Sequence, residues 1–204
     1  ILHTIAQALM IPCLIILLIL MAGAVWQIGD IVVEYIAERR KHKCNVPQLL
    51  RDVHAAGADG LAELIENSGL LRRQKKALLE LAESRGLPKD TLTALAERLL
   101  ATEEARNART TSITDMIAKL GPMFGLLGTL IPLGPGIVAL GQGDTVTLSE
   151  SMNVAFDTTI AGVISAAVAS VISHIRKRWY NDDMVSLETL MEAVLEEVTS
   201  DVEG

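Results

Sequence analysis

The stretch Lys119–Gly136, KLGPMFGLLGTLIPLGPG, is apolar enough to enter a membrane, yet it is crowded with glycine and proline. On a helical wheel at about 100° per residue, its small residues share about one third of the circumference and bulky residues take most of the rest. The small face consists of Gly121, Gly125, Gly128, Thr129, Pro132 and Gly136. Small residues allow helix backbones to approach closely in lipid, so the stretch predicts a membrane-spanning helix with one packing face.

The composition indicates a membrane protein that also has a polar part. Of the 204 residues, 50% are hydrophobic and 21% are charged, which is too many charges for a chain wholly inside lipid. The charges are segregated, because three apolar runs lie between polar segments: Ala8–Ile28, Leu120–Leu140 and Val154–Ile172. Each run is long enough to cross the ~30 Å hydrocarbon core as a helix. No strand alternation occurs, so the sequence predicts an all-α membrane protein with three transmembrane helices.

Long helices are expected to extend from the membrane into a cytoplasmic helical domain. No glycine or proline interrupts the chain between Pro88 and Gly121, so one helix should run from the cytoplasm directly into the second span. Pro132 and Pro135 remove backbone donors and should kink or end that helix near the outer face. The expected divisions are transmembrane helix 1 at 1–28, the cytoplasmic helical domain at 29–112, transmembrane helix 2 at 113–140, an outer loop at 141–150, transmembrane helix 3 at 151–175 and a cytoplasmic C-terminal helix at 176–204.

The topology follows from the distribution of basic residues. Those that flank the three spans are Arg39, Arg40, Lys41, Lys43, Arg106, Arg109, Lys119, Arg176, Lys177 and Arg178, whereas the connection 141–150 has neither Lys nor Arg. The positive-inside rule then predicts a multi-pass protein of the cell (inner) membrane with its N-terminus outside and its C-terminus in the cytoplasm. The first run is expected to be a retained helix, because it lacks a basic segment before it and a clear cleavage site.

The third span has a small face like that of the second. Ala155, Thr158, Thr159, Gly162 and Ser165 follow helical spacing, and bulky residues lie elsewhere. Two readings remain open: the two small faces pack together in a tight hairpin or oligomer, or they line a narrow interior occupied by another helix or by water. The first span has no such stripe and is expected to face lipid.

These residues carry a resemblance to a known family. GPMFGLLGTLIPLGPG, at 121–136, resembles the second transmembrane helix of the MotA/TolQ/ExbB proton-channel family, and AFDTTIAGVISAAVAS, at 155–170, resembles its third. The resemblance implies a homo-oligomeric ring, typically a pentamer, around single-span partner helices resembling ExbD, TolR or MotB. The partner supplies an aspartate, and ion passage past it energises envelope transport or mechanical work. By motif position, the family's channel threonines fall on Thr129 and Thr159.

The expected ion pathway comprises Thr129, Thr159, Thr158 and Asp157, and the expected helix-packing or pore-lining residues are Gly121, Gly125, Gly128, Pro132, Gly162 and Ser165. A threonine hydroxyl can donate to an ionised carboxylate and accept from a protonated one, but it cannot store a proton near neutral pH. The protonatable group must therefore come from elsewhere. A glutamate common in the family's third helix falls at Val154, and Asp157 is outside the pattern. It is either a hydrated residue of the outer mouth or an ion-path carboxylate.

Several functional alternatives also stay open. The hydroxyls of Thr158 and Thr159 would suit a sodium-driven motor subunit as well as a proton-driven one, and a passive scaffold without ion flux would need only the packing faces. The sequence has no GxxxxGK[ST], HExxH, CxxC or GxSxG motif, so we expect neither an enzyme nor a cofactor or metal site. A net charge of −7 argues against a nucleic-acid partner. Which process is energised does not follow from the sequence, although a transport role is favoured over a flagellar one.

Overall fold

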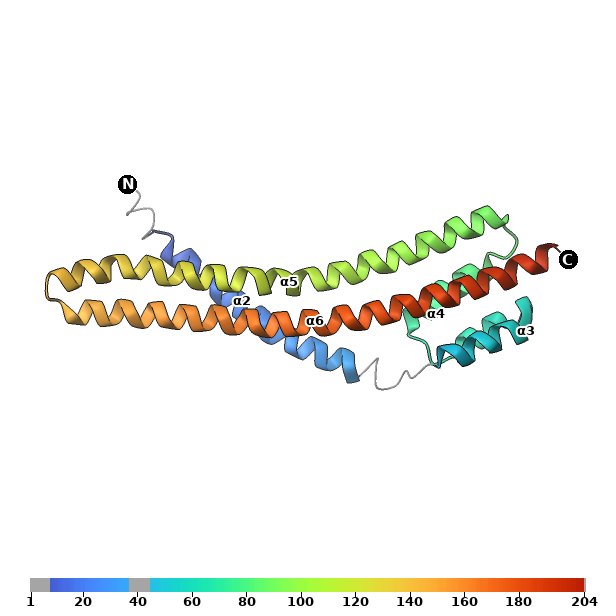
Figure 1. Ribbon diagram of the computed structural model, residues 1–204, viewed down its shortest axis with the longest axis horizontal. Helices are drawn as coiled ribbons and strands as arrows, with labels where there is room; N and C mark the ends of the chain where they lie inside the picture. The colour runs from blue at the N-terminus through green and yellow to red at the C-terminus, as the bar shows by residue number, and fades with distance from the viewer. Residues whose placement is uncertain (1–7, 37–44, 204) are drawn as a thin grey trace. The chain divides into compact units, whose positions relative to one another are not determined.

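The computed structural model describes residues 8–36 and 45–203 (Figure 1). Five helices make up these ranges: α2 (Met10–Glu34), α3 (Val46–Asn67), α4 (Arg72–Glu83), α5 (Lys89–Gly141) and α6 (Thr145–Glu203). The described residues contain no strand, and α2, α5 and α6 are each long and apolar enough to cross a membrane. The predicted all-α membrane fold with three spanning helices is therefore confirmed. The basic residues Arg39, Arg40, Lys41 and Lys43, which supported the topology, lie outside the described residues.

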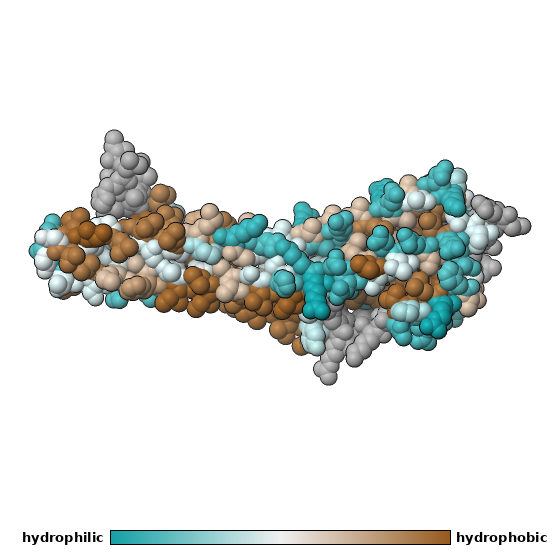
Figure 2. Space-filling view, viewed as in Figure 1, coloured by the Kyte–Doolittle hydropathy of each residue, from teal (hydrophilic) through white to brown (hydrophobic). Residues whose placement is uncertain are grey.

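The chain forms two compact units. The first, which we call the membrane unit, combines the part of α2 up to Ile31 with Thr110–Arg176. The second, which we call the polar unit, combines the segments Val32–Arg109 and Lys177–Gly204. Hydrophobic side chains cover much of the membrane unit, and hydrophilic ones gather on the polar unit (Figure 2). Helices α5 and α6 contribute residues to both units.

Helix α5 is one continuous element, as the sequence predicted. It begins after Pro88, whose carbonyl accepts from the backbone N–H groups of Thr91 and Leu92, and it runs into the membrane unit without a break. Two outcomes were expected for Pro132 and Pro135, a kink or an end of the helix near the outer face; α5 passes both prolines and ends at Gly141. Each proline removes only one backbone donor, and helices in an apolar environment retain their remaining hydrogen bonds because no water competes for them.

The connection at the outer end is shorter than the expected loop of 141–150. Gly143 turns the chain with a φ of 77°, and α6 then begins at Thr145. Asp144 caps the new helix, since its Oδ1 accepts from the backbone N–H groups of Val146 (3.2 Å) and Thr147 (3.1 Å). The Thr147 hydroxyl also donates to this carboxylate (2.5 Å), and this hydrogen bond is the main reason that the pKa of Asp144 is lowered.

Within the membrane unit, α5 and α6 pack as an antiparallel hairpin at backbone distance (Figure 1). A Cβ atom added to Gly162 on α6 would lie 2.5 Å from the Gly121 carbonyl oxygen and 2.8 Å from the Gly125 Cα atom. Farther out, a Cβ on Gly128 would lie 2.7 Å from the Thr158 side chain. No residue larger than glycine fits at these crossings, so the glycines determine how closely the two helices approach.

Helix α2 packs on one side of this hairpin. Its buried positions are Cys13, Leu17, Leu20, Ala24 and Gln27, which recur every three or four residues. Leu20 and Ala24 contact Ile117 and Ala169, and Cys13 and Leu17 contact Ile131. Before Asp30, the other positions of α2 are apolar, and Ile11, Ile15, Leu18, Ile19 and Val25 are exposed. The helix thus has one packing stripe that the uniform hydrophobicity of its sequence did not reveal.

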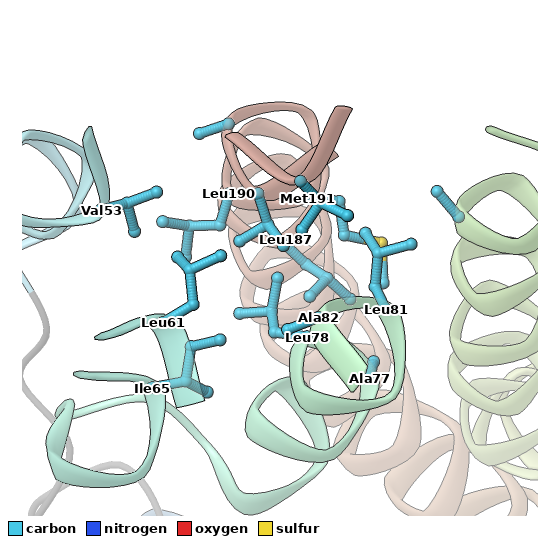
Figure 3. Packing of buried hydrophobic residues seen from close by; sticks show 14 of the residues in the cluster. Val53, Leu61, Ile65, Ala77, Leu78, Leu81, Ala82, Leu187, Leu190 and Met191 are labelled. Carbon is cyan, nitrogen blue, oxygen red and sulfur yellow. The ribbon is translucent and has the colours of Figure 1, made fainter. Parts of the chain in front are cut away.

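The polar unit has its own leucine-rich core (Figure 3). Leu61 and Ile65 of α3, Leu78 and Leu81 of α4 and Leu190 of α6 are fully buried in it. Pro47 lies in the first turn of α3, and Gly57 bends this helix with a φ of 63°. Buried Gln74 accepts from the Leu71 backbone N–H through Oε1 and donates to the Asp183 carbonyl through Nε2. It therefore both caps α4 and links this helix to α6.

The close crossing of α5 and α6 predicts that Gly162→Ala destabilises the membrane unit. The new methyl group meets backbone atoms that have no soft side chain to displace, and such overpacking costs about 1–3 kcal/mol. Gly29→Ala is the matched control, because nothing lies within 4 Å of a Cβ at that helical position. Thermal unfolding in mild detergent should show a lower midpoint for Gly162→Ala only. An equal effect of both substitutions would contradict the crossing.

Candidate functional site

Thr129 and Thr159, which occupy the family's channel-threonine positions among the expected ion-pathway residues, are both half-buried, and each donates its hydroxyl proton back to its own helix. Thr129 Oγ1 donates to the Leu126 carbonyl (2.6 Å), and Thr159 Oγ1 donates to the Ala155 carbonyl (3.0 Å). A hydroxyl that donates in this way keeps lone pairs for a further donor or a cation. Both side chains are therefore satisfied in an apolar environment and still able to bind a polar group.

Thr129 and Thr159 share the side of the hairpin that faces away from α2. At about 100° per residue, Thr129 lies about 160° around α5 from Ile131, which contacts α2. Thr159 lies about 180° around α6 from Val168, which packs against the cluster that includes Leu20 and Ala24 of α2. We call this side the open face. It carries one hydroxyl from each helix of the hairpin.

Thr158 and Asp157 are not on the open face. Thr158 is buried between α5 and α6, where its hydroxyl donates to the carbonyls of Val154 and Ala155 at 2.9 Å and its side chain fills the space beside Gly128. Asp157 is exposed and lies about 160° from Thr159 around the helix. The structure therefore separates these two residues from Thr129 and Thr159.

The residues expected to pack helices or line a pore lie inside the hairpin. Gly121, Gly125, Gly128 and Gly162 form the backbone crossing, and Pro132 is buried. Ser165 is buried as well, and its hydroxyl donates to the Ala161 carbonyl at 2.7 Å. Within one subunit these six positions serve packing and leave the open face to other side chains.

A buried polar cluster occupies the inner end of the membrane unit. Arg176 is 1% exposed, and its guanidinium donates through Nη1 to Gln27 Oε1 (2.8 Å) and through Nη2 to Asp30 Oδ2 (2.5 Å). Thr114 Oγ1 donates to the same Gln27 oxygen at 2.9 Å. We call Gln27, Asp30, Thr114 and Arg176 the inner cluster. It links all three spanning helices by hydrogen bonds.

The sequence analysis missed this cluster because it counted Arg176 among the basic flanking residues that lie in water. The sequence did contain one indication of the cluster. Gln27 interrupts the end of an apolar run, and Asp30 follows it at a spacing of three residues, on the same side of a helix. Nothing in the sequence paired these two residues with an arginine so far along the chain.

A second polar pair lies beside the inner cluster. The Ser173 hydroxyl donates to Asp115 Oδ1 at 2.5 Å, joining α6 to α5. Ser173 is buried and Asp115 is half-buried. Asp115 was not singled out from the sequence, since it belongs to no motif, and Ser173 was counted only among the small residues of the third span. Among the described residues, no group of three or more His, Cys, Asp or Glu side chains is placed to hold a metal ion.

A comparison with protein families gives a match. A model of the MotA/TolQ/ExbB proton channel family matches residues 63–189, which is more than half of the chain. The matched segment contains α4, all of α5 and most of α6, and so includes both threonines of the open face. No curated protein matches the chain.

The inner cluster predicts that Arg176→Met destabilises the protein strongly. Removing one partner of a buried ion pair costs about 3–5 kcal/mol, and the lower end is expected here because Asp30 is half-exposed and can be rehydrated. Arg178→Met is the matched control, because that arginine is exposed. Thermal unfolding in detergent should show a large drop for Arg176→Met alone. Similar midpoints for the two variants would contradict a stabilising role for the cluster.

Proposed function

The chain belongs to the MotA/TolQ/ExbB proton channel family, and from this premise we propose that it is the ring-forming subunit of a proton-driven membrane motor. The observation that carries the proposal is the pair of hydroxyls, Thr129 and Thr159, on the open face of the hairpin. Several copies, five by the family's pattern, enclose the transmembrane helix of a single-span partner that resembles ExbD, TolR or MotB. The partner's aspartate carries the proton past the ring of hydroxyls.

The chemistry of the threonines suits this task. An ionised carboxylate at the centre of a bilayer costs about 2.5–3.5 kcal/mol or more unless water or donors stabilise it. In the described conformation Thr129 and Thr159 accept from a protonated carboxylic acid, because their own protons bind carbonyls of their own helices. Rotation of the hydroxyl turns each residue into a donor for the ionised form. The same ring can thus stabilise the partner's aspartate before and after the proton leaves.

The position of α2 supports the orientation of the subunit in the ring. This helix covers the side of the hairpin opposite the open face, and its remaining surface before Asp30 is apolar. An apolar surface suits contact with lipid, whereas half-buried hydroxyls suit an enclosed interior. We therefore propose that α2 faces lipid and the open face points to the axis of the ring.

The proposed topology places the polar unit in the cytoplasm and the short α5–α6 connection outside. The outer connection has no basic residue, and Arg106, Arg109, Lys177 and Arg178 all belong to the polar unit. This arrangement suits a subunit of the inner membrane that energises envelope transport or mechanical work.

The placement of Thr158 favours protons over sodium as the driving ion. Its hydroxyl is enclosed between α5 and α6 and adds no oxygen to the open face. Each subunit then offers two hydroxyls there, and a sodium site needs several oxygen ligands at close range. Asp157, exposed and turned away from Thr159, is assigned to the hydrated outer mouth.

The ring model predicts that the purified protein is a closed homo-oligomer, with the pentamer as the main species. The open face carries polar groups that a lone subunit would expose to lipid. Native mass spectrometry in mild detergent measures the number of subunits directly. A stable monomer over the accessible concentration range would contradict the ring.

The hydroxyls on the open face predict that Thr159→Val abolishes proton-coupled work without loss of assembly. Valine keeps the shape of the side chain and removes only the hydroxyl, and Thr129→Val should have a similar, milder effect. Proton flux into proteoliposomes that contain the complex with its co-purified partner is the measurement. Thr158→Val is the control, because its hydroxyl faces the helix interface and flux should be retained. Full flux in both open-face variants would contradict the assignment of Thr129 and Thr159 to the ion pathway.

A further inference from the structure

Asp115 and Ser173 lie in register with the two channel threonines. Asp115 precedes Thr129 by fourteen residues on α5, and Ser173 follows Thr159 by fourteen residues on α6. Because α5 and α6 are antiparallel, both offsets lead toward the same, inner end of the hairpin. Fourteen residues correspond to about 21 Å along a helix and return the side chain to within about 40° of its starting face. The hydrogen bond between Ser173 and Asp115 confirms that the two offsets meet.

We propose that Asp115, oriented by Ser173, is the inner proton station of the pathway, where the proton released by the partner's aspartate is received before it enters the cytoplasm. This inference rests on the proposed function. In the transfer, the partner's carboxylic acid gives its proton to a chain of water molecules, the hydronium ion at the inner end of that chain gives the proton to the Asp115 carboxylate, and Asp115 then releases it to cytoplasmic water. Both carboxylates return to the ionised form, and no other reactant is consumed.

The side chains of the open face cannot hold a proton, so the proposed pathway needs a separate proton acceptor on the inner side. Thr129 and Thr159 can pass hydrogen bonds but cannot hold a proton near neutral pH. The partner's aspartate must therefore give up its proton to some acceptor on the inner side. Asp115 is the carboxylate that α5 places on this side of the hairpin, at the inner end and half-buried, so water can reach it. A carboxylate is a proton acceptor with an ordinary pKa near 3.9.

The neighbouring charges favour this side of the hairpin as the exit. Arg176, buried among Gln27, Asp30 and Thr114, places a positive charge on the side covered by α2. Arg176 is already paired with Asp30, so we do not assign a proton carrier to that side. Lys119 and His174 are exposed near the inner end, on α5 and α6 respectively. Asp115 lies toward the open face, away from the pair of Arg176 and Asp30, and is half-buried.

The test measures proton flux in proteoliposomes that contain the complex with its co-purified partner, while the pH on the polar-unit side is varied. Asp115→Asn should lower flux by about tenfold or more, since a positioned proton carrier contributes about 10²–10⁴-fold to a proton-transfer rate. It should also remove the dependence of flux on that pH. Asp115→Glu should restore much of both. Ser173→Ala should move the midpoint of the pH profile, and Ser173→Thr should restore it, which a purely structural serine would not do.

Two controls separate the possible outcomes. Glu104→Gln removes an exposed carboxylate from the same helix and should leave flux and pH profile unchanged. Native mass spectrometry of each variant shows whether the ring has assembled. If wild type carries flux, Thr159→Val abolishes it and Asp115→Asn keeps the wild-type rate and pH profile, the inner station is wrong and the proposed function stands. If wild type carries no flux under proton or sodium gradients, the proposed function itself fails.

Discussion

The backbone contact between Gly121 and Gly162 is the constraint on which the membrane unit depends. Helices that meet through glycine approach until backbone atoms touch, and this fixes their rotation as well as their distance. Once the rotation is fixed, Thr158 must point into the crossing and Thr159, the next residue, must point out of it. The glycines therefore decide which hydroxyl is structural and which is available for function, although they take no part in the chemistry themselves.

The inner cluster solves a different problem, which is how α2 is held in register with the hairpin. An apolar helix that packs on others in lipid gains little from the hydrophobic effect, so polar contacts and close packing must hold it. The Arg176 guanidinium joins Gln27 and Asp30 of α2, and Thr114 of α5 shares the same Gln27 oxygen. Because every one of these groups is bonded where it lies, a rotation of α2 would leave a buried charge without a partner. This fixes the side of the hairpin that α2 occupies and hence the side that stays open.

The sequence predicted the fold class well because the signals for it are local. Apolar runs, the uninterrupted segment after Pro88 and the small stripe of the second span each follow from neighbouring residues. The expected second span, 113–140, ends beside Gly141, the last residue of α5, although Pro132 and Pro135 lie inside this helix. The Asp144 cap, which begins α6 within the expected loop 141–150, was not considered in the sequence analysis.

The candidate site was harder to predict, because the differences between its residues depend on contacts between helices that are far apart in the sequence. Thr158 and Thr159 differ by one helical step, and only the position of α5 tells which of them is enclosed. Asp115 has no motif around it, and it was recognised as a candidate only from its hydrogen bond with Ser173 of another helix.

The same geometry explains why the two polar groups at the inner end, the inner cluster and the pair of Asp115 and Ser173, can have different roles. Arg176 lies on the side covered by α2 and joins the helices by hydrogen bonds, whereas Asp115 lies toward the open face and is half-buried. In the proposed function, the hairpin thus separates structure from ion transfer by side rather than by depth.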